Sequence, residues 1–527
     1  MSDVVERVYT GRSGHVSARR RRTKRRSGCF TIVLFLVLLT VAYGCWITRD
    51  THSVGGFIPA RQKYRCAVTD LLEKRTRVGH SALWRLVPKN TPLAELPEIL
   101  ESDFDFPDWV LNNVVGPNCY FAGDSPADMV FATKMSPVGC LIERPYRFSA
   151  DVTPDHAGGL NLREVPRKAL YYAVRGRVLL LSRSRNALIR SLTLREQDAA
   201  GDDALADTFA QAGAEDVRGV VNFDPGAMPG DLFTSVSFAL QLNASDATLQ
   251  CRAALRPEWR NRGADLLNGV GPSPLIEPAD AMLQISANFN KDLRAIWLSL
   301  GPLFESEVFS AVRWNTWENG ASADLPGLAQ MLANTLGTAG PAFTLNWHGV
   351  DLNEIIPVPE ILGVFQTPDT NLDKIAERLP LAVDGRAPWN PRPGYDAIAK
   401  RITLPMMGGL SIEPTVALYG EHLLVSTSRS VADILLQTPD NVALMPEAEN
   451  GNLFVRIRPG DCAEAVAAIG RTLAENHLLR GHSIESFSAY AAERVAQARQ
   501  IREISLHAYH KNGTITATFK LSMTDER

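Results

Sequence analysis

The chain has few cysteines and little net charge. Its 527 residues include 7 cysteines and no CxxC or CxxH spacing, so a zinc site built from cysteine is not expected. The formal net charge is −3, but residues 1–26 hold nine Lys and Arg against two Asp and Glu, which leaves −10 on residues 27–527. This mildly acidic bulk is unsuited to binding nucleic-acid phosphates, so no nucleic-acid partner is expected.

The chain also lacks the common catalytic motifs. It contains no HExxH, SxxK, GxSxG or Walker sequence, and no GxGxxG follows a predicted strand. Its composition, 45% hydrophobic and 21% charged, excludes collagen, a coiled coil and wholesale disorder. The length allows two to four folding units. We therefore expect a globular protein without cofactor or metal, and our leading hypothesis is that it is not an enzyme.

One long apolar run is present near the N-terminus. The basic sequence RRRRTKRR at 19–26 precedes 20 uncharged residues from Cys29 to Thr48. A helix of that length spans about 30 Å, the hydrocarbon thickness of a bilayer. Segments rich in Lys and Arg that flank a transmembrane helix stay on its cytoplasmic side. The sequence therefore predicts a basic cytoplasmic tail (1–28), an uncleaved transmembrane signal anchor (29–48), a tether (49–63) and a periplasmic main domain, with the bacterial inner membrane as location.

Two other interpretations of this run remain open. A cleaved signal peptide would share the basic start, although Tyr43, Trp46 and Ile47 are unusual near a cleavage site. Lipidation of Cys45 would require a better recognition box than Ala42-Tyr43-Gly44. A mature N-terminus near Cys45 would distinguish both from an anchor.

Cysteine spacing suggests one disulfide in an exported domain. Cys119 and Cys140 bracket a short stretch that contains proline and glycine. If this part of the chain meets an oxidising compartment, they are the best pair among its cysteines. The alternative is that all of the exported cysteines are buried thiols.

An internal repeat indicates two related modules. Residues 173–189 (AVRGRVLLLSRSRNALI) align with residues 417–433 (ALYGEHLLVSTSRSVAD), so that Gly176 matches Gly420. Each copy has the pattern of a strand, a glycine turn, a buried strand and a serine-led helix. A hairpin follows each copy, at 233–255 and at 504–521, the second with an Asn-Gly turn.

These patterns predict an α+β fold with mainly antiparallel sheets. Ala-rich helices are expected at 461–477 and 484–501. We expect a first α+β module at 64–267, a Gly/Pro-rich linker at 268–278 and a second module at 279–527.

One segment carries residue types that could support catalysis. In FTLNWHGVDLNEIIP, His348 lies close in sequence to Asp351 and Glu354. A histidine with two carboxylates could bind a metal or transfer a proton. A strand-end histidine beside solvated acids is the more common meaning of this pattern, so these three are kept only as candidates.

Together with the apolar run, the stretches AVRGRVLLLSRS and NWHGVDLNEIIPVPEIL resemble an uncharacterised bacterial family of inner-membrane-anchored periplasmic proteins with a domain of unknown function. The resemblance implies an envelope-associated accessory role, since some members sit in gene clusters with a bacterial alpha-2-macroglobulin. It implies no catalytic residue.

Two functions follow as hypotheses. The first is a non-enzymatic binding or accessory factor that contacts the membrane through residues 29–48 and an envelope protein through its repeated modules. The alternative is a membrane-tethered periplasmic hydrolase with an unfamiliar active site around His348. Convergence of its polar groups in one pocket would favour the second.

Overall fold

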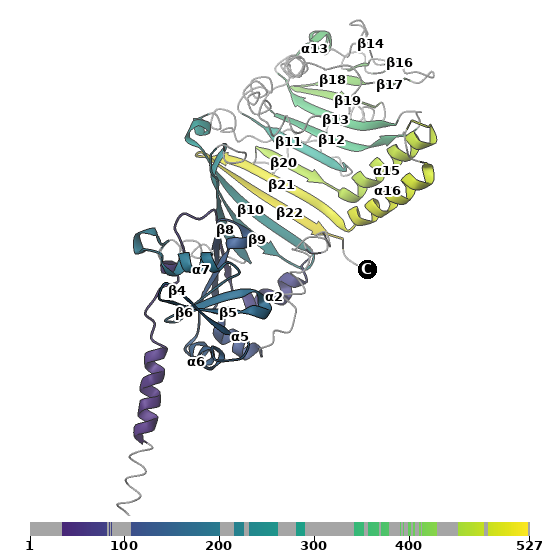
Figure 1. The fold of residues 1–527 in the computed structure, drawn as a ribbon. Helices are drawn as coiled ribbons and strands as arrows, with labels where there is room; N and C mark the ends of the chain where they lie inside the picture. The colour runs from purple at the N-terminus through teal and green to yellow at the C-terminus, as the bar shows by residue number, and fades with distance from the viewer. Residues whose placement is uncertain are drawn as a thin grey trace, which may run out of the picture. The chain divides into compact units, whose positions relative to one another are not determined.

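The chain forms two compact units of mixed α+β structure (Figure 1). Unit 1 comprises Met1–Glu73 and Asp103–Gln211, and unit 2 comprises Lys74–Ser102 and Ala212–Arg527. The computed structural model describes residues 34–81, 84, 86, 107–200, 216–225, 231–261, 281–289, 342–352, 357–367, 370–378, 390–391, 394, 399–401, 404–405, 411–412, 414–428, 452–478 and 483–524. The predicted α+β class with mainly antiparallel strands is confirmed.

Unit 1 is built on one antiparallel sheet in the order β1-β2-β3-β7-β6-β5-β4. Its strands are β1 (Tyr64–Thr69), β2 (Asn118–Gly123), β3 (Val130–Lys134), β4 (Thr153–Ala157), β5 (Leu160–Val165), β6 (Leu170–Arg175) and β7 (Val178–Ser182). Its helices include residues 34–47, α5 (Asp108–Val114), α6 (Pro137–Tyr146) and α7 (Arg185–Leu192), with short 3-10 turns η1 (Gly55–Phe57), η3 (Pro126–Asp128), η4 (Pro166–Lys168) and η5 (Glu196–Asp198).

Helices pack on both faces of this sheet. Strand β7 alternates, so that Leu180 packs with Leu188 of α7 in one apolar cluster, while Leu179 packs with Cys140 of α6 in another. Ile47, at the end of the N-terminal helix, joins the second cluster. Because side chains along a strand alternate between faces, the continuous apolar run of β7 is the pattern of a strand covered on both sides.

Unit 2 contains a broader antiparallel sheet in the order β8-β9-β10-β22-β21-β20-β11-β12-β13-β19-β18-β15-β14. Its strands are β8 (Val217–Asn222), β9 (Phe233–Leu242), β10 (Asp246–Leu255), β11 (Leu283–Asn288), β12 (Ala342–Asp351), β13 (Val358–Gln366), β14 (Asn390–Pro391), β15 (Ala399–Arg401), β18 (Thr415–Tyr419), β19 (His422–Ser426), β20 (Leu453–Ile457), β21 (Ile501–Lys511) and β22 (Thr514–Met523).

Further elements accompany this sheet. Strands β16 (Leu404–Pro405) and β17 (Ser411–Ile412) form a separate two-stranded ladder. The described helices include α13 (Leu372–Arg378), α15 (Pro459–Glu475) and α16 (Ile484–Ala498), while α2 (Leu71–Gly79) spans the boundary between the units in sequence. Helices α15 and α16 confirm the two predicted Ala-rich helices.

The hairpin predicted from the internal repeat is confirmed. Gly176 and Gly420 both have φ of +57°, a conformation that glycine adopts without steric cost. Around them, β6–β7 and β18–β19 pair in the same register along their length. The serine that follows each hairpin bonds in the same way, from Ser184 N–H to Ser182 Oγ at 3.0 Å and from Ser428 N–H to Ser426 Oγ at 3.3 Å.

The same order of strands recurs beyond this hairpin. Unit 1 has the order β1-β2-β3-β7-β6, and unit 2 has β11-β12-β13-β19-β18 with the same antiparallel pairings. Within unit 2, β8-β9-β10 and β20-β21-β22 are likewise paired in sequence order. Strands β10 and β22, the last of each set, pair with one another in antiparallel fashion, so equivalent strands meet around a local two-fold axis.

The two compact units divide the chain differently from the predicted modules. The sequence places the hairpin of β9 and β10 in the first module (64–267), whereas the structure places it in unit 2. The reason is that β10 pairs with β22 over nine residue pairs, from Asp246 with Ser522 to Ala254 with Thr514. The predicted linker at 268–278 lies outside the described residues.

The described part of the N-terminal apolar run is helical. Among the described residues, no helix is both long enough and apolar enough to cross a membrane. Residues 29–33 of the predicted transmembrane segment lie outside the described part of the chain.

Candidate functional site

Of the histidine and two acids singled out in the sequence, the structure describes His348 and Asp351. His348 sits in a β-bulge of β12, where the pairing with β13 skips from Trp347 to Gly349. Asp351 ends the same strand, opposite Val358. At about 3.3 Å per residue, three positions along a strand separate the two backbones by roughly 10 Å.

The bulge has a structural partner of its own. The indole Nε1 of Trp347 donates a hydrogen bond to the carbonyl oxygen of Gly349 at 2.7 Å, which holds the aromatic ring over the bulge. Glu354 lies outside the described residues. Within the described ranges, no three His, Cys, Asp or Glu side chains gather in a way that could hold a metal ion.

Cys119 and Cys140 are both free thiols, so the predicted disulfide does not form in this structure. Each sulfur has its own buried environment. The Sγ of Cys119 on β2 lies 3.5 Å from the carbonyl oxygen of Gly116 and 3.8 Å from the hydroxyl of Thr133. Cys140 packs in the apolar cluster under helix α6. The spacing of the two cysteines in the sequence does not predict the surroundings of either sulfur atom.

Burial makes both thiols poor nucleophiles. Burial raises the pKa of Cys119 to about 11, against a smaller lowering by the Thr133 hydrogen bond, and burial also raises the pKa of Cys140. Since the thiolate is the reactive form, a raised pKa slows alkylation at neutral pH.

We expect Cys119 and Cys140 to resist maleimide in the folded protein at about pH 8. Unfolding in urea should make both react. Peptide mass spectrometry of the alkylated protein measures this. A linked Cys119–Cys140 peptide in the unreduced digest would instead support the disulfide.

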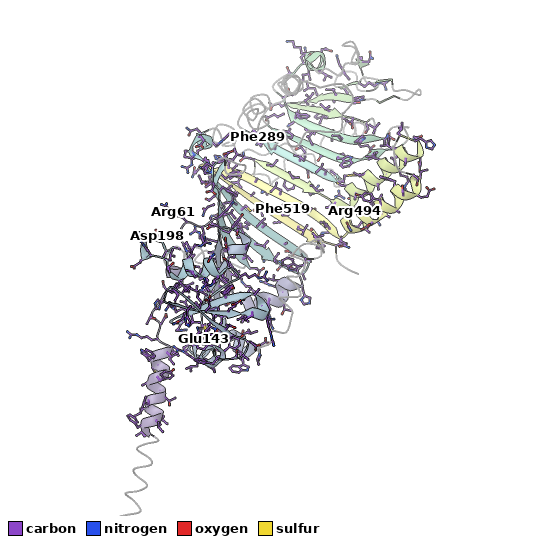
Figure 2. The ribbon with its side chains drawn as sticks, viewed as in Figure 1. Arg61, Glu143, Asp198, Phe289, Arg494 and Phe519 are labelled. Carbon is purple, nitrogen blue, oxygen red and sulfur yellow. The ribbon has the colours of Figure 1, made fainter. Side chains whose placement is uncertain are left out.

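A second buried group in unit 1 is structural. Glu143, labelled in Figure 2, lies in unit 1. It forms an ion pair with Arg147, and both side chains are largely buried. Burial raises the pKa of the Tyr172 phenol, and the nearby Glu143 carboxylate raises it further. Tyr172 therefore stays protonated at neutral pH and belongs to the apolar cluster around Leu179.

Unit 1 also has a polar cleft at the end of helix α7. The cleft has a volume of about 410 Å³ and is lined by Pro59, Arg61, Gln62, Asp124, Ala187, Arg190, Ser191, Thr193, Leu194, Arg195 and Asp198. Pro59 forms an isolated bridge with Ala199, and Ala60 N–H donates to Asp198 O at 2.9 Å, which fixes the two walls. Arg61 and Asp198 mark this region in Figure 2.

The charges of the cleft are mixed. Arg190 lies 3.7 Å from Asp128, and one oxygen of Asp124 accepts the backbone N–H of Lys63 at 3.3 Å. Guanidinium and carboxylate groups thus line the same cleft, which could hold a small ligand that carries both charges. No motif in the sequence marks these residues, since the arginines come from separate segments.

From β10 to β12, the sheet of unit 2 carries a row of polar residues on one face and a row of apolar residues on the other. At β13 the face of Asn346 continues with the buried Leu362. On the polar face, consecutive partners across the strands are Thr248, Lys520, Ser505, Arg456, Gln284 and Asn346. On the opposite face, the next residues form a row that we call the apolar strip: Leu249, Phe519, Leu506, Val455, Ile285 and Leu345. Sequence reasoning missed both rows, because they are assembled from six strands far apart in the chain.

No family model matches the chain. No curated protein matches it. Among solved structures, crystal form III of TP0453 is similar at 11% identity and a TM-score of 0.24, over 44% of this chain and 91% of that chain. Crystal form I of TP0453 is similar at 9% identity and a TM-score of 0.25, over 43% and 89%. TM-scores this low carry no argument about fold or function.

Proposed function

We propose that the protein is a membrane-anchored, non-enzymatic binding protein of the bacterial cell envelope. In this proposal residues 1–28 stay in the cytoplasm, residues 29–48 cross the inner membrane once, and the rest of the chain lies in the periplasm. An envelope protein is the proposed partner.

The observation that carries the proposal is the surface of the N-terminal helix. Its large apolar side chains are 47–69% exposed, and they are Leu34, Phe35, Leu36, Val37, Leu38, Leu39, Val41, Tyr43 and Trp46. A helix that is apolar on all sides is stable when lipid or protein surrounds it, and water does not stabilise it. The basic sequence that precedes this helix favours lipid, with the N-terminus in the cytoplasm.

The repeated strand order supports a contact role. Two related modules are the simplest origin of strands that recur with the same pairings and of two glycine turns with the same φ. Such a duplication presents extended sheet surface for a partner. The alternative, a membrane-tethered hydrolase, would require groups around His348 and Asp351 to converge on one reacting atom.

The test is membrane fractionation of the full chain in a Gram-negative host. We expect the protein to stay in the membrane pellet after alkaline carbonate extraction, and a fusion of alkaline phosphatase after residue 60 to be active. The double variant Leu36→Asp, Leu38→Asp should release the protein, because charged residues at a helix centre oppose insertion by about 2.5–3.5 kcal/mol each.

The matched control is Tyr490→Asp, at an exposed aromatic residue of helix α16, which should leave the protein in the pellet. An inactive phosphatase fusion, or a mature N-terminus near Cys45, would contradict the anchor. A hydrolytic activity that is lost in His348→Ala would contradict the non-enzymatic part.

A further inference from the structure

Burial is inverted across two central strands of unit 2. Gln284 and Asn346 face one another on β11 and β12, and their side chains are 0% and 1% exposed. Their neighbours along the same strands, Ile285 and Leu345, are only partly buried. An antiparallel sheet in a water-soluble protein normally buries its apolar face and exposes its polar face.

This arrangement of buried polar and partly buried apolar side chains is unfavourable in free energy. Among the residues that the structure describes, the side-chain amide atoms of Gln284 and Asn346 have no hydrogen-bond partner. Burying such groups unpaired costs free energy, and leaving aliphatic side chains in water forgoes the gain from their burial. The apolar strip therefore gains from a cover that has no polar groups of its own.

The strip is bounded at both ends. Toward β9, Val78 and Leu86 pack against Leu242, Ala247 and Leu521. Toward β18, Leu372 and Ile375 of α13 pack against Val416 and Leu423. Between these clusters, five side chains of the strip are partly buried and Phe519 is 38% exposed. Phe519 is labelled in Figure 2.

The chemistry of the strip favours a hydrocarbon chain over another protein surface. Its six side chains carry no charge and no hydrogen-bonding group. The six strands from β10 to β12 lie about 4.8 Å apart, so the strip is roughly 24 Å long. One acyl chain spans half of the ~30 Å bilayer core, about 15 Å, and fits within that length. A protein partner of mixed polarity would leave its own polar groups unpaired here.

From these observations we propose that the apolar strip binds the acyl chain of a membrane lipid. The inference goes beyond the proposed function, since it adds a lipid ligand to the envelope-protein partner proposed there. The membrane anchor enters only as the source of lipid. The strip itself is a property of unit 2 and stands without the anchor.

The test uses photo-crosslinking in living cells that express the full chain and are fed radiolabelled phosphate. A benzophenone amino acid replaces Phe519 on the strip or, in a second strain, Lys520, the next residue on the opposite face. We expect labelled lipid on the protein from the position 519 strain and background from the position 520 strain. The swap at Phe519 exchanges one aromatic side chain for another, so the sheet should be retained.

Two further positions separate this inference from the anchor. The probe at Phe35 should also capture lipid if the N-terminal helix is inserted, whereas the probe at the exposed Tyr490 should not. Capture at 519 without capture at 35 would support the strip and contradict the anchor. Capture at 35 without capture at 519 would support the anchor and contradict lipid binding by the strip.

A substitution gives an independent readout. With the probe at Leu506, the change Phe519→Glu should reduce lipid capture at least about ten-fold, since it removes an apolar contact and adds a charge. Lys520→Glu should leave capture unchanged. Equal capture at 519, 520 and 490, or an adduct with a second copy of this chain at 519, would overturn the inference.

Discussion

Replacing Thr518 by proline should unfold unit 2 or reduce its stability by at least about 3 kcal/mol. Thr518 lies in the middle of β22, opposite Gln250 on β10 and His507 on β21. In a strand with neighbours on both sides, each N–H points to one of them, and proline has none to donate. The expected result is a large fall in the urea midpoint, measured by circular dichroism on the full chain in detergent.

The same position supplies the control. Thr518→Val keeps the N–H and the branched side chain, and should change the midpoint little, because both residues favour strands. If Thr518→Pro and Thr518→Val unfold at the same urea concentration, the pairing of β22 between β10 and β21 is wrong.

Replacing Asp216 by alanine should cost about 2–3 kcal/mol of stability. The Asp216 side chain is fully buried, accepts the backbone N–H of Leu242 at 2.7 Å, and forms an ion pair with Arg77. The alanine variant loses both interactions and leaves the Leu242 N–H buried without an acceptor. Arg77 is 43% exposed, so it can turn to water, which keeps the cost below that of a fully buried pair.

Asp216→Asn separates the two contributions. Asparagine can still accept the Leu242 N–H but has no charge for Arg77, so we expect about half of the loss seen with alanine. Urea denaturation of both variants measures this. A loss below about 0.5 kcal/mol for alanine would contradict the buried position of Asp216.

Local features of the fold were predictable from the sequence. The Asn512-Gly513 turn has positive φ at both residues, which Asn and Gly tolerate, and it closes the predicted hairpin. Gly176 and Gly420 set their turns by the same conformational freedom. Helices α15 and α16 could be predicted because each segment is rich in alanine, a strong helix former, over about four turns. In each case the signal lies within a few neighbouring residues.

Features that depend on distant pairing were not predictable. The place of the β9–β10 hairpin in unit 2 could not be predicted, because nothing local marks β10 as the partner of β22. The burial of Gln284 and Asn346 could not be predicted for a related reason. Alternation of polar and apolar residues along β11 shows that the two faces of the strand differ, but it does not show which face is covered. The free thiols of Cys119 and Cys140 could not be predicted from their spacing, because a disulfide also requires the two side chains to point toward each other.

The pairing of β10 with β22 also constrains how the protein is made. Strand β10 pairs with β22, which comes much later in the sequence, so β10 lacks this partner until β22 has been synthesised. Until then it has an unpaired strand edge beside apolar residues, which is the kind of surface that templates aggregation. Long-range strand pairing is also slow to form. The interval between synthesis of β10 and synthesis of β22 is therefore the stage at which we expect the chain to be most prone to aggregation.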